Sequence, residues 1–114
     1  MPDTIFTKII NKEIPAKIAL ETETVLAFYD INPQAPVHIL IIPKKQIPTV
    51  NDIAPTDASL IADMIAAAQK LAKELGIADK GYRLVMNCNQ DGGQEVYHLH
   101  MHLLGGRKMQ WPPG

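Results

Sequence analysis

The sequence predicts an α+β domain, in which a mainly antiparallel sheet of about five strands is covered on one face by a long and a short helix. Short runs of β-branched and other apolar residues, separated by short connections, are typical of antiparallel strands. Between Pro55 and Gly76 the apolar residues instead recur every three or four positions, as in an amphipathic helix. Such a sheet leaves at least one open edge, which favours pairing with a second copy of the chain.

Length, charge and cysteine content are those of a small soluble protein. The 114 residues suit a single domain spanning 1–114, with 46% apolar and 20% charged residues. The net charge of −1 gives no reason to expect polymeric nucleic acid as a partner. Cys88 is the only cysteine, and neither a signal peptide nor an apolar run of membrane-spanning length is visible. We therefore expect a cytoplasmic protein that does not associate with membranes.

The N-terminal half predicts a short helix followed by three strands. Four apolar residues share one helical face, namely Ile5, Phe6, Ile9 and Ile10. Asp3 or Thr4 would cap this helix. The strands are expected at 18–21, 25–30 and 37–42. The third is apolar except for His38, so we expect it to be buried on both faces. The loop 30–36 contains two prolines and must be irregular.

The C-terminal half predicts the long helix and two final strands. The apolar stripe of the helix consists of Leu60, Ile61, Met64, Ile65, Ala68, Leu71, Ala72 and Leu75, and Gly76 is a natural stop. Strands are expected at 82–87 and from near Glu95 to Leu104. The polar loop 88–94 between them contains Gly92 and Gly93, which permit a positive φ and a close approach of backbone to a ligand.

Three of the four histidines alternate with apolar residues in the last expected strand. Alternate side chains of a strand point to opposite faces, so His98, His100 and His102 would share one face. The other face would carry Tyr97, Leu99, Met101 and Leu103. Packing does not explain a row of imidazoles, because each buried ring requires hydrogen-bond partners.

Such a row suits either metal binding or chemistry on phosphorus. Two histidines two positions apart can share a zinc ion, but His98 and His102 would lie roughly 13 Å apart along a strand, too far for one tetrahedral site without a bend. His38 could join such a site only through space. Alternatively, a neutral imidazole can attack phosphorus while its neighbours bind phosphate oxygens and transfer protons. A histidine row with no chemical role is the third interpretation.

The segment 98–104 reads HLHMHLL, which resembles the His-φ-His-φ-His-φ-φ motif of the histidine triad superfamily. Further segments resemble its Hint branch, the histidine triad nucleotide-binding proteins. They are FTKII at 6–10, KEIPA at 12–16, DINPQAPVH at 30–38, IPKK at 42–45, GYR at 81–83, DGGQ at 91–94, GGR at 105–107 and WPPG at 111–114. The resemblance covers nearly the whole chain.

The resemblance implies a five-stranded antiparallel sheet that pairs into a ten-stranded sheet in a homodimer. It implies hydrolysis of purine nucleoside 5′-phosphoramidates, which releases AMP or GMP and an amine, with no metal and no cofactor. The C-terminal tail, 105–114, with Trp111, would approach the active site of the partner. Alternatives are a zinc- or nucleotide-binding interaction module without catalysis, or a dinucleoside polyphosphate hydrolase of the same superfamily. His102 favours a hydrolase, because related transferases have glutamine at that position.

Site residues follow from the resemblance position by position. His100 would attack the α-phosphorus and form a nucleotidyl-histidine, His102 would contact the phosphate, and His98 with His38 would orient the nucleophile and pass protons. Residues expected around the nucleotide are Asp30 at the ribose, Ile31 at the base, Ile5, Phe6, Ile9 and Phe28 in the apolar wall, and Asn87, Gly93, Gln94 and Glu95 near phosphate and ribose. Many Hint proteins have serine in place of Glu95. We expect its backbone to make the contact, because a carboxylate would repel phosphate.

Overall fold

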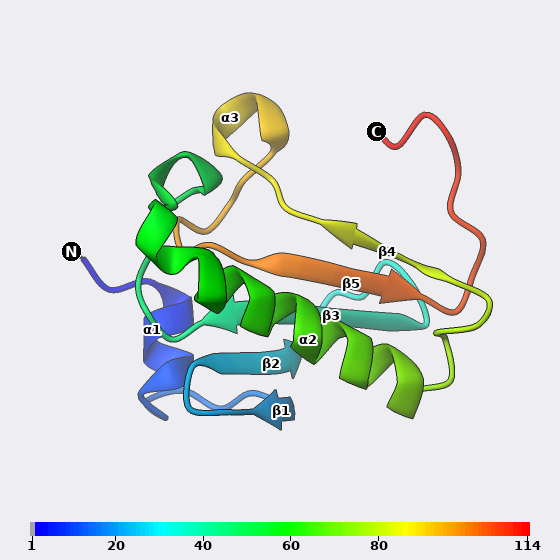
Figure 1. Ribbon diagram of the computed structural model, residues 1–114, viewed down its shortest axis with the longest axis horizontal. Coiled ribbons are helices and arrows are strands. Elements are labelled where there is room, and N and C mark those ends of the chain that lie inside the picture. The colour runs from blue at the N-terminus through cyan, green and yellow to red at the C-terminus, as the bar shows by residue number, and fades with distance from the viewer. Residues whose placement is uncertain (1) are drawn as a thin grey trace.

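The computed structural model describes residues 2–114 and contains the predicted five-stranded antiparallel sheet (Figure 1). The strands are β1 (Ile18–Glu21), β2 (Val25–Tyr29), β3 (Val37–Pro43), β4 (Tyr82–Val85) and β5 (Met101–Gly105). Their order across the sheet is β1-β2-β3-β5-β4, and every neighbouring pair is antiparallel. The C-terminal strand β5 therefore lies beside the central strand β3, which brings two segments far apart in the sequence together.

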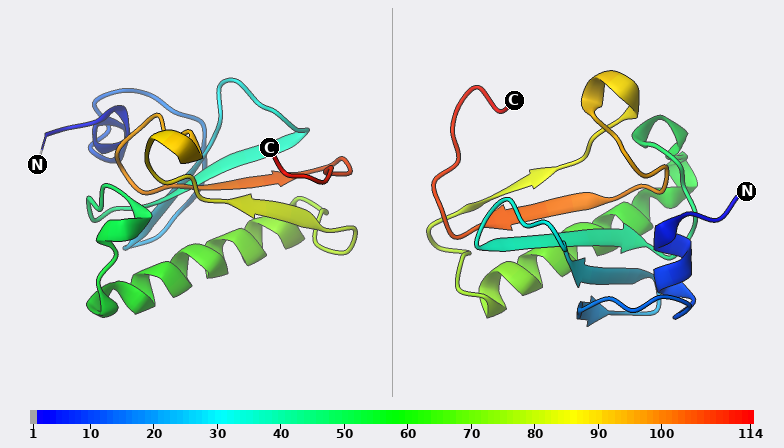
Figure 2. Two further views of the ribbon diagram at one scale, coloured as in Figure 1. Left: turned by 90° about the horizontal axis from the view of Figure 1, so that it is seen from above. Right: turned by 180° about the vertical axis from the view of Figure 1, so that it is seen from behind.

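The two longer helices lie on opposite faces of the sheet, so the prediction that helices cover one face is wrong (Figure 2). α2 (Ala58–Glu74) packs on the face that contains Ile39 and Leu103. α1 (Ile5–Ile10) packs on the other face, against Phe28 and Leu40. β2 and β3 are buried on both faces, so each face requires a cover. α1 is short, and it leaves β5 and β4 without a helix on its side of the sheet.

α1 begins where the sequence predicted a cap. The Thr4 hydroxyl accepts hydrogen bonds from the backbone N–H groups of Phe6, at 3.1 Å, and Thr7, at 3.3 Å. The Thr7 hydroxyl accepts in return from the Thr4 N–H at 2.7 Å, which completes a capping box. Because these bonds satisfy the first free N–H groups, a helix of only six residues is stable enough to place Phe6 over the sheet.

α2 has the predicted amphipathic form, with two corrections at the margin of its apolar stripe. Its buried residues are Met64, Ala67, Ala68, Leu71 and Ala72. Ile65 and Leu75 were expected in the stripe but are 36% and 37% exposed. The sheet covers the helix from one side only, and the small alanines allow it to lie close, so residues at the edge of the stripe stay in solvent.

The remaining elements are short. η1 (Val50–Asp52) and η2 (Pro55–Asp57) are 3-10 turns before α2, and α3 (Asn89–Gly92) is a single helical turn inside the segment expected to be a polar loop. β4 ends at Val85 rather than at residue 87, and β5 begins at Met101 rather than near Glu95. Within residues 2–114 there is no helix with the length and apolar character needed to cross a membrane.

Candidate active site

The histidines gather on the sheet face that α1 leaves partly open. β3 and β5 pair so that Leu40 lies opposite His102 and His38 opposite Leu104. Opposed residues of an antiparallel pair point to the same face, so the side chains of His38 and His102 meet there. His98 and His100 precede β5 and enter the site from its N-terminal end. Two imidazoles from adjacent strands and two from the segment before β5 thus gather on one face of the sheet.

The segment before β5 is irregular because it bonds to the connection after β3 rather than continuing the sheet. His98 Nε2–H donates to the Pro43 carbonyl at 2.7 Å, and Leu99 N–H donates to the Ile47 carbonyl at 2.6 Å. The Gln94 side chain donates to the Pro48 carbonyl at 2.8 Å. The single histidine strand expected from the sequence is therefore wrong for residues 95–100. The alternation of its apolar residues is correct for three of four positions: Leu99, Met101 and Leu103 enter the main core, whereas Tyr97 is exposed.

His100 is held in one tautomer by the backbone. Its Nδ1 lies 2.7 Å from the carbonyl oxygen of His98 and must donate to it, because a carbonyl has no proton to give. Nε2 of the neutral ring then keeps its lone pair. The ring is 7% exposed and meets the edge of Phe6 at a centroid distance of 5.0 Å. Burial lowers the pKa of His100, which keeps Nε2 unprotonated near neutral pH.

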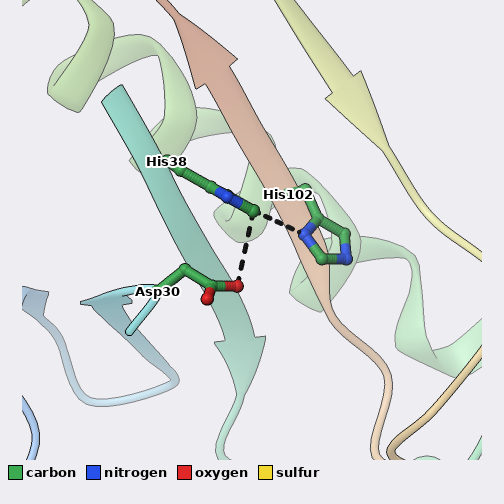
Figure 3. Close-up of side chains that lie close together, drawn as sticks. All are labelled: Asp30, His38 and His102. Atoms are coloured by element: carbon green, nitrogen blue, oxygen red, sulfur yellow. Dashed lines mark hydrogen bonds and ion pairs between the residues drawn. The ribbon is translucent and has the colours of Figure 1, made fainter. Parts of the chain in front are cut away.

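A second tautomer is defined at His38. The backbone N–H of Gln34 donates to His38 Nδ1 at 3.0 Å, so the proton of the neutral ring is on Nε2. Nε2 lies 2.9 Å from Nδ1 of His102 and 3.5 Å from Oδ2 of Asp30 (Figure 3). His38 therefore donates to His102, whose own proton lies on Nε2. Nε2 of His102 is thus available as a hydrogen-bond donor to a substrate oxygen.

All four imidazoles are kept neutral by their surroundings. Burial is the largest cause in each case, and it lowers the pKa of His38, His98 and His100 below the ordinary value of 6.5. Burial, with the nearby rings of His100 and His38, lowers the pKa of His102 to about 4. The negative charge of Asp30 acts in the opposite direction and raises the pKa values of His38, His100 and His102. A neutral row of this kind can offer both lone pairs and N–H donors near neutral pH.

Among residues 2–114, Asp30, His38 and His102 are the set whose ligand atoms lie close enough for a metal ion, within 4.8 Å of one another. Sequence spacing did not indicate a carboxylate beside these rings. A metal ion on His38 Nε2 would require the ring proton on Nδ1, where it would face the N–H of Gln34. The observed hydrogen bonds therefore favour a proton, not a metal ion, between His38 and His102.

Comparisons with known proteins agree with this geometry. The family model described as the HIT domain matches residues 11–109. A relative named purine nucleoside phosphoramidase, from Escherichia coli (strain K12), is 57% identical over 107 residues, which are 94% of this chain and 90% of the relative. The crystal structure of a HIT family hydrolase from Legionella pneumophila Philadelphia 1 has a TM-score of 0.96 and 55% identity, covering 98% of this chain and 100% of that one. The chain belongs to the HIT domain family. A histidine triad nucleotide-binding protein from Candida albicans is also similar, with 32% identity and a TM-score of 0.82 over 96% of this chain and 83% of that one.

The positions that the HIT resemblance assigned to the nucleotide fall into three groups. Phe6, Ile9 and Phe28 are buried together beneath α1, whereas Ile5 and Ile31 are 51% and 100% exposed. Asp30 is half-buried at the start of the loop that follows β2. The third group, Asn87, Gly93, Gln94 and Glu95, surrounds α3 and the irregular segment that leads to the histidines.

Gln94 makes side-chain bonds that the sequence did not indicate. Its side chain is buried and bonded entirely to backbone: Oε1 accepts from Asn89 N–H at 2.9 Å, and Nε2 donates to the carbonyls of Pro48, at 2.8 Å, and Val96, at 3.0 Å. It therefore positions the loop, and a direct side-chain contact with nucleotide is not supported. Gly93 has φ +78° at the end of α3, a conformation that favours glycine. Glu95 is exposed, and its charge raises the pKa of His100 against the effect of burial.

Proposed function

We propose that this chain is a purine nucleoside phosphoramidase with His100 as its nucleophile. The observation that supports this most directly is the hydrogen bond from His100 Nδ1 to the His98 carbonyl at 2.7 Å, which leaves the Nε2 lone pair for attack on phosphorus. The Escherichia coli relative named purine nucleoside phosphoramidase supports the substrate class. Two further expectations belong to the same proposal. The single cysteine favours a cytoplasmic location, and residues 1–114 form one domain.

The reaction has two steps. His100 Nε2 attacks the α-phosphorus, the P–N bond of the substrate breaks, and the amine leaves with a proton. Water then attacks the phosphorus, the bond between phosphorus and His100 breaks, and the nucleoside monophosphate is released. His102 donates its Nε2 proton as a hydrogen bond to a phosphate oxygen, because its Nδ1 already accepts from His38 at 2.9 Å. His98 orients the nucleophile through its carbonyl oxygen, and His38 passes protons through His102.

The nucleotide extends from this centre toward Asp30. One oxygen of that carboxylate accepts from the Asn32 N–H at 2.7 Å, which leaves further lone pairs for ribose hydroxyls. Ile31 is fully exposed beside it and would cover the base, together with Ile5. On the phosphate side we assign the contact to the Glu95 backbone N–H, because the N–H groups of Gly93 and Gln94 already donate to the carbonyls of Gln90 and Asn89, both at 3.0 Å. No metal or cofactor takes part in this scheme.

We also propose a homodimer formed through β4, which joins the two sheets into one of ten strands. The two edges of the sheet differ. β1 has an irregular register between Ile18 and Leu20, and Glu21 at its end pairs with two lysines, features that discourage further pairing. β4 has a regular register with β5 and exposes Leu84. The tail after β5 would then lie near the partner's active site.

Turnover of adenosine phosphoramidate tests the proposed reaction. We expect hydrolysis by the native chain, unchanged after exhaustive chelation, and a loss of at least about 10³-fold in His100→Ala, because the covalent pathway is removed. A diadenosine polyphosphate serves as the competing substrate and should be a poor one. Loss of activity on chelation that zinc restores would instead favour the metal-dependent alternative, and near-normal turnover of His100→Ala would contradict the nucleophile assignment.

A further inference from the structure

The tautomer of His38 depends on one backbone N–H in an exposed loop. Gln34 lies in the segment 30–36 between β2 and β3, and its side chain is exposed. The pairing of β2 with β3 ends at Tyr29, and one further bond, from the Asp30 N–H to the His38 carbonyl at 3.0 Å, fixes only the start of the segment. Other contacts must therefore hold the Gln34 N–H at 3.0 Å from His38 Nδ1. Inside the loop, the side-chain amide Nε2 of Gln34 donates to the Asn32 carbonyl at 3.0 Å. That bond joins two residues of the same loop and does not anchor Gln34 to the rest of the fold.

The anchor comes from the start of the C-terminal tail. Arg107 Nε donates to the Gln34 carbonyl at 3.1 Å, and Arg107 Nη1 donates to the Lys108 carbonyl at 3.3 Å. Immediately before it, Gly106 lies against Pro36, so closely that a Cβ at Gly106 would be 2.8 Å from the Pro36 Cβ. Gly106 also has φ +89°, which favours glycine. The tail therefore touches the loop at two adjacent positions.

We propose that Arg107 is a positioning residue that, by holding Gln34, keeps His38 in the tautomer that donates to His102. The chain of contacts runs from the Arg107 guanidinium to the Gln34 carbonyl, and from the Gln34 N–H to His38 Nδ1. It continues from His38 Nε2 to His102 Nδ1. The catalytic meaning of this proposal rests on the proposed function of His38, but the tautomer itself does not.

Loss of the anchor has a defined chemical consequence. When the Gln34 N–H moves away, Nδ1 of His38 can take up a proton, and the ring can become an imidazolium next to Asp30, 3.5 Å away. The other titratable group facing His38 is His102 from β5, with His100 behind it, while α1 presents apolar Phe6 and Ile9 to this face. Asp30 thus favours the protonated form once the opposing N–H is gone.

The test compares Arg107→Gln with two matched variants. Arg107→Lys keeps a donor that can reach a carbonyl, and Lys108→Gln removes one positive charge from the next residue, whose side chain has no hydrogen-bond partner among residues 2–114. Arg107 is exposed, so all three variants should fold. Two-bond ¹H–¹⁵N spectra of the imidazoles distinguish protonated from unprotonated ring nitrogens, and they report the His38 tautomer without any assay of turnover.

We expect His38 Nδ1 to be unprotonated in the native chain, in Arg107→Lys and in Lys108→Gln, and to gain protonation in Arg107→Gln. In that variant kcat should fall by roughly threefold to tenfold, less than the contribution of a complete acid–base group, while KM changes little. The acidic limb of its pH profile should move to higher pH. An unaltered His38 spectrum in Arg107→Gln would overturn the proposal. An altered spectrum with unaltered turnover would support the anchor and would contradict the proposed role of His38 in catalysis.

Discussion

At the scale of single residues, the chemistry of the site is set by hydrogen bonds that decide where each imidazole proton lies. A backbone carbonyl accepts a hydrogen bond from Nδ1–H of His100 and so keeps the proton on that nitrogen, whereas a backbone N–H donates to Nδ1 of His38 and so excludes a proton there. These opposite arrangements leave a free lone pair on the first ring and an N–H donor on the second. In the proposed reaction, the same residue type therefore serves as nucleophile and as proton donor within one site.

The lowered pKa values predict how stability depends on pH. In the unfolded chain the histidines titrate near 6.5, whereas the pKa of His102 in the folded chain is about 4. As the pH falls below about 6.5, the unfolded chain binds protons that the folded chain does not, so the free energy of unfolding decreases. The contribution of His102 to the free energy of unfolding is fully present above pH 6.5, the pKa in the unfolded chain, and is lost as the pH falls toward 4. It amounts to about 1.4 kcal/mol per unit of pKa difference, reduced because the ring is partly exposed.

Urea unfolding at pH 7 and pH 5 of the native chain and of His102→Gln measures this contribution. The variant has no titrating group at that position, so its free energy of unfolding should decrease less between the two pH values than that of the native chain. Carboxylates titrate alike in both proteins and cancel in the comparison. Equal decreases in the two proteins would show that the pKa of His102 is not lowered by folding.

At the scale of elements, an irregular connection positions the histidines as much as the sheet does. The segment 43–48 accepts hydrogen bonds from His98, Leu99 and Gln94, and it fixes the path of the chain into β5. Gln94 contributes a buried amide whose three bonds all go to backbone. Without it, an N–H and two carbonyls of this region would lose their partners.

We expect Gln94→Leu to lower the free energy of unfolding by about 2–4 kcal/mol, because buried polar groups left unpaired cost about 1–3 kcal/mol each. Turnover should fall as well, since the segment that carries His98 and His100 loses its anchor. Gln90→Leu, on the exposed surface of α3, is the matched control and should change stability by less than about 0.5 kcal/mol. Urea titrations of the three proteins would refute the positioning role if the two variants were equally stable.

The spacing of apolar residues predicted the elements in which one pattern of burial continues from end to end. The apolar stripe of α2 and the continuous apolar run of β3 are of this kind, and both were placed correctly. The segment before β5 looked like a strand because His98 and His100 alternate with apolar residues. Its hydrogen bonds go to residues far away in the sequence, and no local pattern reveals them. The side of the sheet that α1 covers was also unpredictable, because it depends on packing against strands that lie far away in the sequence.

The candidate site was predictable to the extent that side-chain type determines chemistry. The four histidines and Asp30 were named from the sequence and from its resemblance to a family, and the structure brings His38, His102 and Asp30 together. The sequence did not predict that the Gln34 N–H and the His98 carbonyl fix the tautomers of His38 and His100, because every residue type other than proline supplies both backbone groups. The bonds of the Gln94 side chain to backbone were not predicted either, since an amide side chain suits nucleotide and backbone equally well.

At the scale of the whole molecule, the two edges of the sheet predict how copies of the chain assemble. Leu84 on β4 and Ile18 on β1 are exposed to similar extents, 37% and 39%, at opposite edges. Leu84→Asp should dissociate the proposed dimer, because a charge at the pairing edge is costly to bury, whereas Ile18→Asp should leave it intact. Analytical ultracentrifugation measures both. A native chain that sediments as a monomer, or a dimer that only Ile18→Asp disrupts, would contradict pairing through β4.

The central claim is that His100 becomes covalently attached to the nucleotide, and intact-mass analysis tests it most directly. The native chain is mixed with adenosine phosphoramidate and quenched within the first turnover in alkaline denaturant, because a phosphorus–imidazole bond is labile in acid. We predict a mass increase of one adenylyl group, located by peptide mapping at His100 and absent from His100→Ala. An adduct on another residue, or an adduct that persists in His100→Ala, would contradict the account.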